Sequence, residues 1–162
     1  MALKFIYTFF IGLLFATLVG VGISAFYESP KNPDYPARLS VAQKENLSEK
    51  EHEELVAEQE KFDRQQKEFQ TKNEVYNRNV SVIAIVASII TLIVSLTLFK
   101  KILVIADGLL LGGVLTIFYG IIRGFGSGDD KFRFIIVLIG FIVSLTLGYI
   151  KFIKPQVKKV KV

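Results

Sequence analysis

Residues 48–79 read SEKEHEELVAEQEKFDRQQKEFQTKNEVYNRN, and residues 80–99 continue directly as VSVIAIVASIITLIVSLTLF. No glycine or proline interrupts the first stretch, and Glu, Lys and Gln, which are good helix formers, dominate it. The second stretch is almost wholly apolar and has roughly the 20 residues that a helix needs to cross a ~30 Å hydrocarbon core. The sequence therefore predicts a long charged helix at 48–79 followed by a transmembrane helix, and whether the two are continuous stays open.

Three other blocks are also long and apolar enough to cross a bilayer, and they lie at residues 1–27, 102–122 and 134–152. A cleaved signal peptide is the alternative for the first block, with Ile23-Ser24-Ala25 as its cleavage site. That block is too long for this alternative, because the apolar region of a signal peptide has about 7–15 residues. We therefore predict an all-α polytopic membrane protein, a four-transmembrane-helix bundle with a long extracytoplasmic helical arm between the first and second spans.

The prediction divides the chain into five segments. We expect a first transmembrane helix at 1–27, a proline-containing riser with a short helix at 28–47, a charged helix at 48–79, transmembrane helices 2–4 within 80–152 (80–99, 102–122 and 134–152), and a basic tail at 153–162. The charged helix and the riser together form the arm.

Lysines indicate how these spans are oriented. With four spans, one face of the membrane collects eight of them: Lys4, Lys100, Lys101, Lys151, Lys154, Lys158, Lys159 and Lys161. The short loop on the opposite face has Arg123, Lys131 and Arg133 beside two aspartates. Because cytoplasmic segments carry the excess of Lys and Arg, we expect both termini in the cytoplasm and residues 28–79 outside it. The expected location is the cell membrane, and the bacterial inner membrane is the one we favour.

The composition argues against several classes of function. The net charge of +5 does not indicate a nucleic-acid partner, because residues 28–80 hold 12 acidic and 9 basic side chains and the surplus of Lys and Arg lies beside the apolar blocks. The chain has no cysteine, and its one histidine, His52, lies among glutamates on the charged helix, so we predict no metal site and no catalytic residue. We expect no cofactor and no enzymatic activity. The expected partners are the lipid bilayer and other membrane-protein subunits or further copies of the chain.

Small residues recur at every fourth position in the apolar blocks. Such tracks let helix backbones approach closely in a bilayer, where little hydrophobic force drives helices together. The predicted helix-packing residues are Gly12, Ala16, Gly20 and Ser24 in the first block, Gly108, Gly112, Thr116 and Gly120 in the third, and Gly140, Ser144 and Gly148 in the fourth. Whether these tracks pack within one chain or between copies stays open.

The charged helix carries one line of large side chains at seven-residue spacing: Leu55, Phe62, Phe69 and Tyr76. The companion heptad positions are polar, so this stripe is too narrow to hold a two-stranded coiled coil by itself. We expect it to contact a single partner, which is the riser, a second copy of the chain or another protein.

Prolines recur every third residue in the riser, at Pro30, Pro33 and Pro36, which matches the three-residue turn of a polyproline II helix. We favour a stiff exit from the membrane, and a docking site for an aromatic groove is the alternative. An upright arm and an arm folded flat, with a break at Asn77-Arg78-Asn79, both fit the sequence.

Asp107 is the one acidic residue inside a predicted span. A carboxylate within a membrane usually marks an ion path or a proton relay. However, Asp107 lies six residues beyond Lys101, about 9 Å along a helix axis, and a long lysine side chain can extend toward it. We favour a structural pair, with an ion path as the alternative.

Two functional hypotheses follow. The favoured one is a non-enzymatic membrane scaffold, assembly or interaction subunit that uses the arm and close helix packing. The alternative is a small channel or transporter component with Asp107 on an ion path. The glycine-rich third span and the repeat of IVSLTL at 93–98 and 142–147 motivate this alternative.

Overall fold

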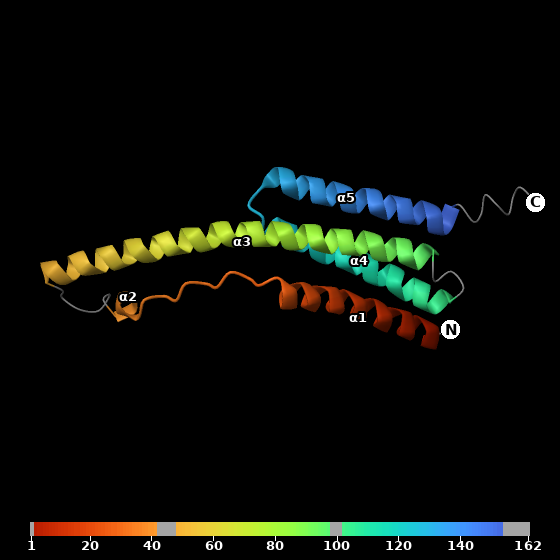
Figure 1. Cartoon of the computed structure of the whole chain (residues 1–162), viewed down its shortest axis with the longest axis horizontal. Coiled ribbons are helices and arrows are strands. Elements are labelled where there is room, and N and C mark those ends of the chain that lie inside the picture. Colours follow the sequence, from red (N-terminus) through yellow and green to blue (C-terminus); the bar gives the residue numbers. More distant parts are fainter. Residues whose placement is uncertain (1, 42–47, 98–101, 154–162) are drawn as a thin grey trace, which may run out of the picture. The chain divides into compact units, whose positions relative to one another are not determined.

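The computed structural model describes residues 2–41, 48–97 and 102–153 (Figure 1). Every element in these ranges is a helix: α1 (Ala2–Phe26), α2 (Ala37–Val41), α3 (Glu49–Thr97), α4 (Leu103–Phe125), α5 (Asp130–Gly148) and a final π-helical turn, η2 (Tyr149–Ile153). Four helices are long and apolar enough to cross a membrane, namely α1, α3, α4 and α5 with its extension to Lys151. The prediction of an all-α chain with four such helices is confirmed.

Residue contacts divide the chain into two units. The first comprises Ser29–Tyr76 and is called the polar unit below. The second comprises residues 1–28 together with the chain from 77 onward and is called the apolar unit. Helix α3 contributes residues 49–76 to the polar unit and residues 77–97 to the apolar unit.

Two hydrogen bonds between Ser48 and Glu51 mark the start of helix α3. The backbone N–H and the hydroxyl of Ser48 both donate to Oε2 of Glu51, at 2.9 and 2.7 Å. These bonds occupy polar groups that the first turn of a helix leaves without a helical partner, and they lower the pKa of the Glu51 carboxyl. Helical structure then continues through residues 77–79, where the flat-arm alternative placed a break.

Within the apolar unit, α1 and α4 run in one direction, and α5 and residues 77–97 of α3 run in the other (Figure 1). The start of α1 and the end of α5 therefore lie at the same end, which holds Lys4 and Lys151 and is called the lysine end below. The opposite end holds residues 126–129 between α4 and α5 and is called the turn end. A buried cluster of Leu92, Ile117 and Leu147 joins α3, α4 and α5.

The turn between α4 and α5 explains where α4 ends and where α5 begins. Gly128 has a φ of 70°, a left-handed conformation that glycine adopts without a steric penalty. Asp129 then caps α5, because its Oδ1 accepts from the backbone N–H groups of Lys131 and Phe132 at 2.9 and 3.3 Å. As a result, α5 begins four residues before the predicted span at 134–152, and α4 continues past the predicted end at 122 to Phe125.

Candidate functional site

In the polar unit, the proline segment lies along the aromatic stripe of α3. Pro30, Pro33 and Pro36 are partly buried, whereas the four residues between them are exposed. Residues 30–34 form one side of a groove, and the other side consists of α3 residues Gln65, Glu68, Phe69 and Lys72. The prolines therefore present one edge of the segment toward the helix.

An aromatic contact joins the same two stretches of chain. The ring of Tyr35 meets the ring of Phe62 edge-on, with centroids 5.2 Å apart and planes at 79°, which is a favourable arrangement of two aromatic quadrupoles. Leu55, Phe62 and Phe69 are partly buried, and Tyr76 is buried. Three partners were considered for the stripe: the riser, a second copy of the chain and another protein. The riser is the one that contacts the stripe within the polar unit, through Tyr35 and Phe62.

The outward surface of the polar unit is charged. Residues 49–60 of α3 contain six glutamates and one lysine, while residues 61–76 contain four basic and three acidic side chains. Two exposed ion pairs at i,i+4 spacing, Glu60 with Arg64 and Glu68 with Lys72, have N–O distances of 3.6 and 3.9 Å. Such pairs add little stability, so the charges remain accessible to a partner.

In the apolar unit, the backbones of α1 and α4 come very close. A methyl group added to Gly108 would lie 2.7 Å from Cγ2 of Ile11, and one added to Gly112 would lie 3.0 Å from Cβ of Phe15. On the α1 side, a methyl group on Gly12 would lie 3.1 Å from the carbonyl oxygen of Gly108. Three of the predicted helix-packing residues thus meet at one parallel helix interface.

The rest of the α1 track contacts α4 less closely. Ala16 is partly buried, and a methyl group on Gly20 would lie 4.0 Å from Cζ of Tyr119. Ser24 is exposed and donates its hydroxyl hydrogen to the carbonyl oxygen of Val21 in its own helix.

A second face of α4 packs against α3. A methyl group on Gly120 would lie 3.0 Å from Cγ1 of Ile85, and one on Gly113 would lie 2.7 Å from Cδ2 of Leu92. On Gly124 it would lie 2.9 Å from Oγ of Ser81. Sequence analysis missed Gly113 and Gly124, although their spacing from Gly120 by seven and four residues is also typical of one helix face.

Of the packing residues predicted in α5, Gly140 lies close to a described side chain of α4. A methyl group on Gly140 would lie 2.9 Å from Cδ1 of Ile121 of α4. Ser144 is exposed and donates to the carbonyl oxygen of Gly140 at 2.8 Å. A methyl group on Gly148 would meet no other described atom within 4 Å.

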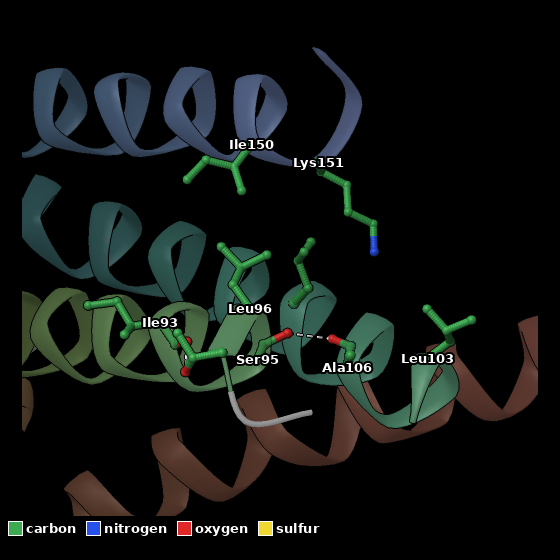
Figure 2. Close-up of a pocket in the computed structure, with 9 residues that line it drawn as sticks. Ile93, Ser95, Leu96, Leu103, Ala106, Ile150 and Lys151 are labelled. Atoms are coloured by element: carbon green, nitrogen blue, oxygen red, sulfur yellow. Dashed lines mark hydrogen bonds between the residues drawn. The ribbon is translucent and has the colours of Figure 1, made fainter. Parts of the chain in front are cut away.

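Asp107 pairs with Lys151 at the lysine end, with 2.5 Å between Nζ and Oδ1. The two side chains are 43% and 36% exposed, respectively. Lys151 of this pair lines a cavity of about 440 Å³ formed by α3, α4 and the end of α5 (Figure 2). Lys101, the partner considered from the sequence, is outside the described residues.

Three consecutive residues of α3 reach three different elements at the turn end. Asn77 donates to a carbonyl oxygen of the turn at 3.4 Å, and Asn79 donates to the Tyr27 hydroxyl after α1 at 2.8 Å. The guanidinium of Arg78 lies 5.3 Å from the centre of the Phe132 ring of α5, within cation–π range. Residues 77–79, considered from the sequence as a break, therefore connect α3 to the ends of its neighbours.

Comparison with protein-family models, curated proteins and solved structures found no match to this chain. Among the residues that the structure describes, no three His, Asp or Glu side chains gather where they could hold a metal ion. The packing and the surfaces of the two units are therefore the features that indicate function.

Proposed function

We propose that this chain is a non-enzymatic membrane scaffold or assembly subunit, with the polar unit as its interaction arm outside the cytoplasm. The observation that carries the proposal is the edge-on contact of Tyr35, within the proline segment, with Phe62 of α3, which joins two stretches of chain into one arm. Because Leu55, Phe62 and Phe69 are partly buried and Tyr76 is buried, the accessible surface of the arm is mainly charged. A preorganised surface loses little conformational freedom on binding, which favours a role in recognition.

The charges of the arm suggest what it binds. The glutamate-rich residues 49–60 differ from residues 61–76, where basic and acidic side chains are nearly balanced. Electrostatic complementarity contributes specificity and speeds association, so the partner is a membrane-protein subunit that presents basic side chains to the start of α3.

In this proposal the four apolar helices cross the cell membrane as a bundle, with the lysine end in the cytoplasm. Figure 1 shows the start of α1 and the end of α5 at one end of the apolar unit, and Lys4 and Lys151 belong to these two stretches of chain, which supports this orientation. Residues 28–79 are then extracytoplasmic. Close packing at Gly12, Gly108 and Gly112 joins α1 and α4 within the bundle.

The alternative is a small channel or transporter component with Asp107 on an ion path. An ion path needs polar groups or water along much of a span. Lys151 is the one titratable side chain among the described residues that line the cavity beside Asp107, and it is already paired with that carboxylate. This geometry favours the scaffold.

The proposal is tested by replacing residues 29–76 with a flexible Gly/Ser linker. Crosslinking and mass photometry of detergent extracts should then show loss of the complexes that the intact chain forms, while the four spans still insert. A milder variant, Glu53→Lys with Glu54→Lys, should weaken the same complexes, because both side chains are exposed and reversal opposes a basic partner. Its matched control, Lys67→Glu, changes an exposed charge elsewhere on α3.

Complexes of unchanged mass and abundance after the replacement would contradict the scaffold. The alternative predicts ion flux through vesicles that hold the intact protein, and its loss in Asp107→Asn. Flux with this behaviour would establish the channel function in place of the scaffold.

A further inference from the structure

An apolar space opens between three helices at the lysine end of the apolar unit. The cavity of about 440 Å³ is lined by Ile93 and Leu96 of α3, by Leu103 and Leu110 of α4, and by Ile150 after α5 (Figure 2). A second cavity of about 180 Å³ between α3 and α5 shares Ile93, Leu96 and Ile150 with the first. The two cavities therefore adjoin along one predominantly apolar wall.

The packing of α5 explains where this space begins. Near the turn end, a methyl group on Gly124 of α4 would overlap Cδ1 of Ile136, and further along Gly140 lies close to Ile121. Both cavities lie beyond these contacts, from Ile142 toward Lys151. An apolar space in a protein within a bilayer forfeits dispersion contacts unless it is filled, and the available filler of matching chemistry is a lipid acyl chain.

The polar groups inside the larger cavity already have partners. The Ser95 hydroxyl donates to the carbonyl oxygen of Ala106 at 2.6 Å, as Figure 2 shows, and the Thr97 hydroxyl donates to that of Ile93 at 2.7 Å. The wall therefore offers an occupant mainly apolar contact, which suits a hydrocarbon chain.

Among the residues that the structure describes, one charge of each sign lies at or beside the larger cavity. Lys151 lines the cavity and pairs with Asp107, and both side chains are partly exposed. An ammonium has three N–H donors and a carboxylate has several acceptor sites, so each can bond to its partner and to a further group. A purely anionic headgroup would meet Asp107 as well as Lys151, whereas a headgroup with both charges matches both.

We propose that this space is a binding site for one phospholipid whose headgroup carries a phosphate and a primary ammonium. The acyl chain occupies the space between α3, α4 and α5. The phosphate accepts from Lys151, and the ammonium donates to Asp107. This inference rests on the proposed membrane location of the apolar unit and is independent of what the arm binds.

The test uses the full chain in nanodiscs that contain equal parts of phosphatidylethanolamine, phosphatidylcholine and phosphatidylglycerol. Native mass spectrometry after release into detergent should show one retained phosphatidylethanolamine. Its retention should fall roughly tenfold in Asp107→Asn and in Lys151→Gln, as expected when a hydrogen bond to a charged group is lost. The matched control Asp130→Asn removes a carboxylate at the turn end and should leave retention unchanged.

Equal retention of the three lipids, or selective retention of phosphatidylglycerol, would overturn the assignment of the headgroup. Filling the cavity with Leu96→Trp should abolish retention, but this variant could also disturb folding. The unaltered protein therefore supplies a second measurement, with a photoactivatable phosphatidylethanolamine whose acyl chain carries a diazirine. Crosslinks should concentrate on residues 93–96 and 143–150, and an even spread that includes the exposed Leu14 and Leu18 of α1 would refute a defined site.

Discussion

The two units of this chain bring helices into contact with other elements by opposite means. In the polar unit, large aromatic side chains on α3 lie against a proline-rich segment, and Tyr35 and Phe62 meet ring to ring. In the apolar unit, α1 and α4 meet where side chains are missing, at Gly12, Gly108 and Gly112. Burial of rings releases water and is favourable in an aqueous setting, whereas within lipid the gain comes from close packing of backbones. Added volume should therefore be the damaging change at the α1–α4 contact of the apolar unit, and lost volume the damaging change at the rings of the polar unit.

The largest effect is expected from adding volume between α1 and α4. Gly108→Leu should destabilise the apolar unit by about 3 kcal/mol, because its first side-chain atom would already lie 2.7 Å from Ile11. Unfolding in detergent micelles, followed by circular dichroism, measures the change. Gly22→Leu is the matched control, because a methyl group there meets no described atom within 4 Å. Equal destabilisation by the two variants would show that the close approach is not what stabilises the unit.

In the polar unit, the next largest effect is expected from removing the volume of a ring. Phe62→Ala deletes a partly buried ring and its contact with Tyr35, at an expected cost of about 1–2 kcal/mol. Hydrogen exchange and protease cleavage should both increase in residues 29–36. Val56→Ala, at a side chain that is 48% exposed, should leave both unchanged. If Phe62→Ala also leaves them unchanged, the stripe does not hold the proline segment.

Breaking an ion pair in either unit should reduce stability by a smaller amount than the two volume changes. Asp107→Asn should cost about 1 kcal/mol or less, because both members of the pair are more than a third exposed and solvent weakens their attraction. Glu60→Gln, in a pair whose side chains are 76% and 66% exposed, should cost only a few tenths of a kcal/mol. Unfolding at low and high salt checks both values. A larger loss for Glu60→Gln would reverse the expected order.

The smallest effect concerns pH at the start of α3. Bonds from the Ser48 hydroxyl, and to a lesser degree from its backbone N–H, lower the pKa of Glu51 below its ordinary value of 4.5. The contribution of these bonds to the first helical turn is therefore complete above pH 4.5 and is lost as the pH falls through the lower value in the folded chain. In an NMR titration, Ser48→Ala should raise the pKa of Glu51 while Ser48→Thr, which keeps the hydroxyl, should not. An unchanged pKa in Ser48→Ala would assign the shift to the backbone bond.

Local patterns were sufficient to predict that the elements are helices and that four of them are apolar. Length and hydropathy indicated the four apolar helices, and the absence of glycine and proline from 48 to 79 indicated a long charged helix, whereas its continuation past residue 79 was one of two alternatives. The contacts within the candidate sites could be predicted less well from the sequence. Four-residue spacing pointed to Gly108, Gly112 and Gly120, yet the first two face α1 and the third faces α3. Small changes in the rotation of a helix select its neighbour, and residue spacing along one helix carries no information about the position of another.

The sequence by itself therefore determined that the chain is helical and that four helices can cross a membrane, because these properties depend on the composition and length of single stretches of chain. Only the tertiary structure decided that the proline segment contacts Phe62 through Tyr35, that Asp107 pairs with Lys151, and that residues 77–79 connect three elements. Each of these contacts joins residues far apart in the chain. Their formation depends on how whole helices pack, which is a property of the surrounding volume and charge rather than of local sequence.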